Sequence, residues 1–292
     1  MFFQSKKLKR TILLGYRAYA RSMVFLPGPP IFVNSMPKSG THLLTNVLAA
    51  LPRTMPSGLH VQTWQCHRGP ETRAAADAFV VDRAKLDRFL RRANAGQIVT
   101  GHLPWRDEIG TVLRDRGHAV LFNIRDPRDI LVSQLRYILG LRRHYLHERL
   151  LSGYPDDDRR LLALITGAPP RGDREAAPLH PFGRRLRQRL GWRTAPGVHV
   201  TRFEELVGAR GGGDPRAQRR TIAAVAAHVR RSLDDRALEA LVDRLAGSGS
   251  FTFRRGVIGD WRNHFTDAHK AAFKEQAGQA LIELGYETDL NW

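Results

Sequence analysis

The stretch IFVNSMPKSGTHLLTNVLAA, residues Ile31–Ala50, joins a segment typical of a buried strand to one typical of a helix. Its first part, Ile31–Ser35, is mostly apolar or small, and leucine and valine recur at helical spacing after Thr41. A tight turn, Pro37–Thr41, connects the two parts and leaves the amides of the first helical turn without backbone partners. Free amides at the positive end of a helix dipole favour a bound anion. The stretch therefore predicts an anion-binding loop between a strand and a helix.

Three further segments have the composition of buried strands, and segments with helical patterns lie between them. These predicted strands are Gln97–His102, His118–Arg125 and Val198–Phe203. Strands that alternate with helices form a parallel sheet with helices on its faces, so we expect an α/β fold with a central parallel sheet and a P-loop-like architecture. Ligands of such sheets bind beyond the carboxyl ends of the strands, which is where Lys38, His102 and Arg125 fall.

The chain of 292 residues is long enough for one large domain, which we place at residues 31–292, after a basic leader at residues 1–30. An arginine-, proline- and glycine-rich segment with weak periodicity, at about residues 142–196, is predicted to be a lid or an acceptor-binding insertion. Further helices are expected near Asp82–Arg92, Pro127–Leu141, Arg216–Arg231, Asp234–Leu245 and Asp267–Gly285.

The composition is that of a globular protein, with 42% hydrophobic and 26% charged residues. The formal net charge of +19 favours anionic ligands, although solvated arginine-rich faces account for part of it. The single cysteine, Cys66, excludes an internal disulfide and a cysteine-cluster zinc site, and it fits a reducing, cytoplasmic compartment. The leader is too short and too charged to span a membrane, which leaves open a packed helix or a basic helix that rests on a membrane surface.

The order of residues in the anion loop differs from that of the Walker motif, in which the lysine follows the glycine. Here Lys38 precedes Ser39, Gly40 and Thr41, so its ammonium approaches the anion from the other side. No acidic partner accompanies the hydroxyls of the loop to hold magnesium, which favours a metal-free site and the transfer of a group less charged than a phosphoryl. Gly40 lets the backbone approach an anion, and the side chains around it, including His42, add donors.

Five segments resemble motifs of the sulfotransferases that use 3′-phosphoadenosine 5′-phosphosulfate (PAPS), in the same order along the chain. The donor loop of that family, YPKSGTTW, is similar to MPKSGTHL here, and its catalytic KTHLP is similar to TGHLP. An arginine followed eight positions later by a serine is matched by RDPRDILVS, and RKGxxGDWKNxFT is matched by RRGVIGDWRNHFT. The segment TRFEELV is similar to the strand that leads to YEDL in the family. In order, these segments are Met36–Leu43, Thr100–Pro104, Arg125–Ser133, Thr201–Val207 and Arg254–Thr266.

The resemblance implies that PAPS is the sulfuryl donor, that 3′-phosphoadenosine 5′-phosphate (PAP) is released, and that a hydroxylated acceptor is the other partner. It implies His102 as the catalytic base, for which the ordinary histidine pKa of about 6.5 is suitable, and Lys38 as the cation beside the leaving oxygen. The structural alternatives are a histidine that ends a buried strand and a solvated turn lysine. The donor-binding residues that the resemblance implies are Pro37, Lys38, Ser39, Gly40, Thr41, His42, Arg125, Ser133, Phe203, Arg254, Arg255 and Gly256.

Some positions depart from the family pattern. Leu43 stands where the family has an adenine-stacking tryptophan, Phe203 where it has a tyrosine, and Thr100 where it has a lysine. We therefore expect a different mode of adenine binding and the loss of one auxiliary charge. The spacing from Arg125 to Ser133 predicts a chain that curves around the 3′-phosphate, because a straight helix would carry them about two turns apart. The dimer motif of the cytosolic members is only partly matched, which leaves the oligomeric state open.

Two other interpretations stay open on the residues alone. A P-loop-type ATP-dependent kinase also presents backbone amides to phosphate, and it predicts protection by ATP and a magnesium requirement. A nucleic-acid-binding protein would suit the net charge and the basic segment RRLRQRLGWR, Arg184–Arg193, although its interleaved aromatic, Trp192, belongs to no recognisable reader module. The sulfotransferase hypothesis predicts no nucleic-acid partner.

Loops near the expected cleft are the candidates for the acceptor pocket. They are His60–Pro70, Tyr137–Tyr154 and the segment before Pro196. Their aromatics and histidines suit a hydroxylated, partly apolar ligand, and their arginines suit one that is already anionic. Abundant arginine, alanine and glycine are typical of a GC-rich bacterial sequence, which favours the hydroxyl of a specialised metabolite, a lipid or a saccharide as the acceptor.

Overall fold

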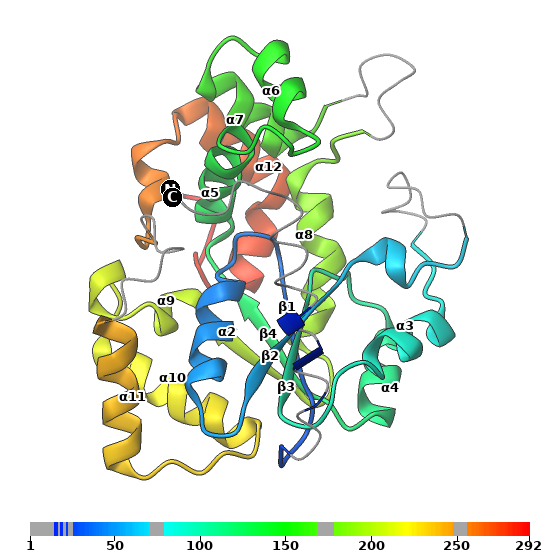
Figure 1. Ribbon diagram of the computed structural model, residues 1–292. Coiled ribbons are helices and arrows are strands. Elements are labelled where there is room, and N and C mark those ends of the chain that lie inside the picture. The colour runs from blue at the N-terminus through cyan, green and yellow to red at the C-terminus, as the bar shows by residue number, and fades with distance from the viewer. Residues whose placement is uncertain are drawn as a thin grey trace.

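The computed structural model describes residues 15–16, 18–19, 22, 26–69, 79–168, 178–247 and 256–292. Its centre is a five-stranded parallel sheet with the strand order β2-β3-β1-β4-β5 (Figure 1). The predicted α/β fold with a central parallel sheet is therefore confirmed, and each of the predicted strands is present. The strands are β1 (Ile31–Ser35), β2 (Met55–Val61), β3 (Gln97–Gly101), β4 (Ala119–Ile124) and β5 (Val198–Arg202).

Strand β1 lies in the middle of the sheet, between β3 and β4. Because side chains alternate along a strand, Phe32 faces one layer of helices, and Ile31 and Val33 face the other. All three side chains are fully buried. A strand that is covered on both faces needs apolar side chains at nearly every position, which explains the continuous apolar run. Strand β1 therefore starts the Pro37–Thr41 loop at the centre of the sheet.

Helices cover both faces of the sheet, and Figure 1 shows α2, α10 and α11 on one side and α3 and α4 on the other. The helices that share a core with Ile31 and Val33 are α2 (Thr41–Ala50), α10 (Pro215–His228) and α11 (Asp235–Gly247). The larger core around Phe32 includes α3 (Arg83–Leu90), α4 (Asp107–Asp115), α5 (Pro127–Leu139), α7 (Asp157–Thr166), α8 (Phe182–Leu190) and α12 (Asp267–Glu283).

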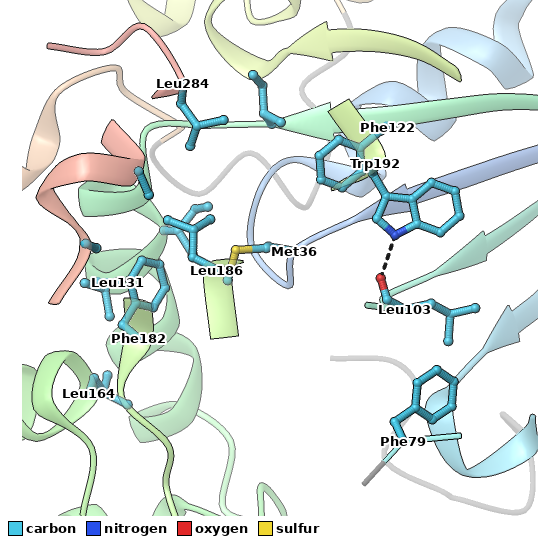
Figure 2. Packing of buried hydrophobic residues seen from close by; sticks show 14 of the residues in the cluster. Met36, Phe79, Leu103, Phe122, Leu131, Leu164, Phe182, Leu186, Trp192 and Leu284 are labelled. Atoms are coloured by element: carbon cyan, nitrogen blue, oxygen red, sulfur yellow. Dashed lines mark hydrogen bonds between the residues drawn. The ribbon is translucent and has the colours of Figure 1, made fainter. Parts of the chain in front are cut away.

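The segment at residues 142–196 contributes helices to the larger core. It contains α6 (His147–Gly153) as well as α7 and α8, and its Trp192 is fully buried. The indole N–H of Trp192 donates to the carbonyl oxygen of Leu103 (3.0 Å), and the indole stacks against Phe122, with ring centroids 6.2 Å apart (Figure 2). Large buried aromatic side chains contribute several kcal/mol to folding, about 3–5 by truncation. Helix α8 is therefore held firmly beside the sheet.

Strand β2 is a strand that the sequence pattern did not predict. Among the described strands it pairs with β3 alone, at the edge of the sheet, and its register shifts between Pro56 and Leu59. Proline and glycine residues such as Pro56 and Gly58 weaken a strand pattern, but they are tolerated at sheet edges and bulges. This explains why the segment resembled a loop, and it adds His60 to the carboxyl end of the sheet.

Helix α5 begins directly after Arg125. The Asp126 side chain caps it by accepting from the amide of Arg128, and Pro127 occupies the first turn. The helix is then continuous to Leu139. The prediction that the chain curves between Arg125 and Ser133 is therefore wrong, because the cap and the proline start a regular helix at once. Arg125 precedes this helix, and Ser133 lies on it.

Of the predicted leader, only residues 15–16, 18–19, 22 and 26–30 are among those described. The Tyr16 hydroxyl donates to the carbonyl oxygen of Pro56 (2.6 Å), which ties this part of the chain to β2. In the residues described, no helix has both the length and the apolar character needed to cross a membrane.

Cys66 is fully buried just after the short helix η1 (Thr63–Gln65). Its Sγ lies 3.6 Å from the carbonyl oxygens of Gln62 and Thr63. Burial, with a smaller effect of Asp82, raises the pKa of the Cys66 thiol to about 12. A thiol with so high a pKa is protonated and unreactive at neutral pH.

Candidate active site

A cavity of about 2500 Å³ opens beyond the carboxyl ends of β1, β3 and β4. Its lining joins residues that are far apart in the sequence. Of the predicted site residues that the structure describes, all except Ser39 line it. Arg254 and Arg255 lie outside the described residues. The residues in the lining are Pro37, Lys38, Gly40, Thr41, His42, His102, Arg125, Ser133, Phe203 and Gly256.

The loop after β1 is held in place by a buried asparagine on the neighbouring strand. The Asn123 side chain donates to the carbonyl oxygen of Ser39 and accepts from the Thr201 hydroxyl (2.7 Å). Gly40 has a φ of 89° and serves as the N-cap of α2. A Cβ at this position would lie only 2.6 Å from Cδ2 of Phe203. Both the backbone angle and the close approach therefore require glycine here.

The loop has donors that no other described group uses. The hydroxyl of Ser39 is buried and has no hydrogen-bond partner in the described part of the chain. Gly40, as N-cap, offers no side-chain acceptor to the first amides of α2. An unpartnered buried donor costs free energy unless a ligand satisfies it, and amides at a helix N-terminus favour anions. The residues present therefore fit the phosphate end of a nucleotide such as PAP.

Lys38 brings a positive charge to this loop from a strained backbone position. Its φ of 74° lies in the left-handed region, which a lysine rarely adopts. Its Nζ lies 4.4 Å from the centroid of the Tyr137 ring, a cation–π contact across the cleft to α5. Burial, and then the nearby Arg125, lower the pKa of Lys38. Strain that persists at a cation inside a cavity is typical of a functional position.

Arg125 connects the loop after β1 with the loop that begins at Gly256. Its guanidinium donates to the carbonyl oxygens of Lys38 (3.4 Å) and Val257 (3.3 Å), and it lies 4.2 Å from the Phe203 ring centroid. Its Nε is buried and has no partner among the described groups. Arg125 and Gly256, predicted to bind the same phosphate, are therefore brought to the same part of the cavity.

A buried carboxylate holds this second loop in place. Asp129 accepts from the amides of Gly259 and Trp261 (2.9 Å each), and it lies 3.7 Å from the guanidinium of Arg125. Burial raises the pKa of Asp129, and the Arg125 charge opposes this rise. Ser133, one turn further along α5, also lines the cavity. The start of α5 thus positions both ends of the predicted 3′-phosphate site.

His102 is oriented by the end of β1. Its Nδ1 lies 2.9 Å from the carbonyl oxygen of Ser35, which can only accept a hydrogen bond. Nδ1 therefore carries the proton, and Nε2 keeps a lone pair that can accept one. Burial, then His60 and, more weakly, Arg189, lower the pKa of His102 to about 3. This is far below the ordinary value expected from the sequence, because the ring is desolvated and has basic neighbours.

His60 is a candidate functional residue that the sequence pattern missed, since it lies on the unpredicted β2. Its ring meets that of His102 edge to face, with centroids 4.8 Å apart. Its Nδ1 lies 2.9 Å from the hydroxyl of Thr100, the residue that replaces the lysine of the sulfotransferase motif. Burial and the nearby His42 lower the pKa of His60. The charge-bearing neighbour of His102 thus comes from another strand.

Comparison with known proteins finds a fold and no sequence family. No protein-family model matches the chain, and no curated protein matches it in sequence. The structure of mouse sulfotransferase SULT7A1 complexed with PAP matches with a TM-score of 0.55 and 16% identity, over 91% of both chains. The chain has a sulfotransferase-like fold. Retinol dehydratase with retinol and PAP matches with a TM-score of 0.49 and 16% identity, over 91% of this chain and 86% of that one.

A metal is not part of the predicted site. Within the residues described, no three His, Cys, Asp or Glu side chains gather as a bound metal ion would require. The expectation of a metal-free donor site stays a prediction.

Proposed function

We propose that this protein is a sulfotransferase that transfers the sulfuryl group of PAPS to a hydroxyl of a small-molecule, lipid or saccharide acceptor and releases PAP. The observation that carries the proposal is the shared cavity, in which Lys38, Arg125 and His102 meet around unpartnered donors. The sulfotransferase-like fold supports it, because the mouse protein of that fold was solved with PAP.

The donor would lie along the carboxyl ends of β1 and β4. The Pro37–His42 loop would hold the 5′-phosphate through its amides and the Ser39 hydroxyl. Arg125, Ser133 and Gly256, together with Arg254 and Arg255, would hold the 3′-phosphate. Phe203, already against the guanidinium of Arg125, would contact the adenine. When bound, PAPS supplies a sulfuryl group that its bond to the 5′-phosphate has already activated.

His102 and Lys38 would divide the chemistry. His102 Nε2 takes the proton of the acceptor hydroxyl while the acceptor oxygen bonds to sulfur and the bond from sulfur to the 5′-phosphate oxygen breaks. Lys38 neutralises the charge that grows on that leaving oxygen. The pKa of His102, about 3 in the free protein, leaves the ring neutral and ready to accept. Negative charge bound near Lys38 and Arg125 would raise this pKa and make His102 a stronger base.

Thermal melting with nucleotides tests the donor assignment. We expect PAP at about 100 times its Kd to raise the Tm by about 5–10 °C, more than ATP or ADP does, and EDTA to leave this shift unchanged. Transfer of label from PAPS to a pool of hydroxylated compounds would then identify acceptors. Stabilisation by ATP with magnesium but not by PAP would contradict the proposal and favour the kinase interpretation. A nucleic-acid role is not favoured, because Trp192 is fully buried.

A further inference from the structure

Two arginines of α8 extend into the cavity on the side of His102. Arg185 and Arg189 lie one helical turn apart, and both line the cavity. Arg189 donates to the carbonyl oxygen of His102 (3.1 Å) and to that of Arg185 (2.7 Å). Arg185 donates to the carbonyl oxygen of Leu164 (2.9 Å) and to the side chain of Gln134 (3.2 Å). The two guanidiniums are thus fixed beside the proposed catalytic base.

These two guanidiniums lack the acidic partners that other arginines in the protein have. In the described part of the chain, neither Arg185 nor Arg189 forms an ion pair, and the Nε of each is buried with no hydrogen-bond partner. By contrast, Arg128 bonds to the carboxylates of Asp126 and Glu287. Burial lowers the pKa of Arg185 and of Arg189 to about 10, and Arg185 adds to the effect on Arg189.

Two adjacent buried cations repel each other and are poorly solvated, so they favour the binding of an anion between them. A guanidinium fork also matches the two oxygens of a carboxylate or of a phosphate or sulfate ester. The donor phosphates already have their own cations, Lys38 and Arg125, at the loops after β1 and β4. The α8 pair is therefore left for the other substrate.

We propose that Arg185 and Arg189 bind an anionic group of the acceptor, so that the substrate is a hydroxylated compound that already carries a carboxylate, a phosphate or a sulfate. This inference rests on the proposed sulfotransferase function. Because Arg189 contacts the backbone of His102, the bound anion lies close to the imidazole, and the reacting hydroxyl lies a short distance from the anionic group within the same molecule.

The anion would also act on the base itself. Arg189 is one of the charges that lower the pKa of His102. An anion that neutralises Arg189 weakens this effect and strengthens His102 as a proton acceptor. A neutral acceptor of the same shape would bind more weakly and would also react more slowly once bound.

Titration calorimetry on the PAP-loaded protein tests the inference with matched pairs of probes. The pairs are 4-hydroxybenzoate with its methyl ester and glucose 6-phosphate with glucose, which separate a carboxylate from a phosphate requirement. We expect the anionic member of at least one pair to bind about tenfold or more tightly than its neutral partner. In Arg185→Gln/Arg189→Gln, this preference should disappear. In Arg187→Gln, which removes an exposed guanidinium of the same helix, it should stay.

The affinity for PAP serves as the control for folding, because the α8 pair is not assigned to the donor. If the double variant fails to bind PAP, Arg185→Lys/Arg189→Lys, which keeps both charges, is the second variant, and it should retain the preference for the acid. The inference is overturned if the neutral members bind as tightly as the acids, if no member of either pair binds, or if the preference survives in the double variant. Failure of PAP to bind the wild type contradicts the proposed function instead, and the same titrations without PAP then decide on the anion site.

Discussion

The rings of His60 and His102 meet edge to face with their centroids 4.8 Å apart, at the ends of two neighbouring strands. Two imidazolium ions at this distance would repel, so His60 helps to keep His102 neutral. In His60→Phe, which keeps an aromatic edge without the charge, we expect the pKa of His102 to lie above its wild-type value of about 3. Titration of the His102 ring signals by NMR measures this. His199→Phe on β5 is the control, and an equal shift there would remove the role of His60.

Replacement of the proposed base should cost far more. We expect His102→Gln to lower kcat by about 10²–10⁴-fold, the usual contribution of general base catalysis, with little change in the Kd for PAP. The glutamine keeps an N–H donor for the Ser35 carbonyl oxygen. A kcat within a factor of about two of wild type would show that another group accepts the proton.

Acid should destabilise the protein through two buried histidines. The folded-state pKa values are about 3 for His102 and about 4 for His118, below the ordinary value of about 6.5. Between these values the unfolded chain binds protons that the folded chain does not, so stability is complete above about pH 6.5 and falls as the pH decreases toward 4. We expect His118→Gln to lose less stability than wild type between pH 7 and pH 5, measured by urea unfolding. His118 does not line the cavity, so its PAP affinity should be unchanged.

Gly40→Ala should combine a backbone penalty with a steric clash. The left-handed φ costs about 1–2 kcal/mol for alanine, and contact with Phe203 adds about 1–3 kcal/mol. Gly117→Ala is a matched control, because Gly117 has a φ of 66° and a Cβ added there would meet no described neighbour within 4 Å. We expect unfolding free energy to fall more for Gly40→Ala, and PAP affinity to fall for that variant alone. Equal losses for both variants would mean that the neighbouring Phe203 simply moves away.

The strained lysine separates stability from rate. Lys38→Gly relieves a left-handed φ and Lys38→Met does not, so the glycine variant should be more stable than the methionine variant by about 1 kcal/mol. Both should transfer the sulfuryl group at least about a hundredfold more slowly while still binding PAP. Thermal unfolding and single-turnover rates measure the two effects. Faster transfer by Lys38→Gly than by Lys38→Met would assign the effect to the backbone instead of the ammonium.

Arg125→Gln should act on one phosphate of the donor. Loss of a charge-assisted contact weakens PAP binding by about 10–100-fold, and adenosine 5′-phosphate, which lacks the 3′-phosphate, should be affected much less. Calorimetry with the two nucleotides gives the ratio. Arg219→Gln, which removes an exposed ion pair on α10, is the control and should change neither affinity. A parallel loss for both nucleotides would place Arg125 away from the 3′-phosphate.

The strands that the sequence predicted correctly are those with continuous apolar runs, because β1, β3 and β4 are covered on both faces. Strand β2 was missed because Pro56 and Gly58 interrupt its pattern, and the pattern of one strand cannot reveal pairing with a strand about forty residues away. His60 was missed with it. The loop residues and Arg125 could be placed together because the carboxyl ends of parallel strands share one edge.

The α8 arginines were hidden for a different reason. In the sequence they belong to a uniformly basic run, and nothing in it distinguishes Arg185 and Arg189 from Arg187. Burial of Phe182, Leu186 and Trp192 in the core fixes which side of the helix faces inward. That choice depends on packing against other elements of the fold, which a local pattern does not contain. The low pKa of His102 likewise depends on neighbours from several elements.

The buried, unreactive thiol of Cys66 makes the wild-type chain suitable as a background for site-specific labelling. A maleimide dye would react with a cysteine introduced at an exposed position and leave the native one untouched. Val257, which is exposed and follows Gly256, is such a position. A fluorophore there would report nucleotide occupancy in real time, without removal of any native side chain from the protein interior.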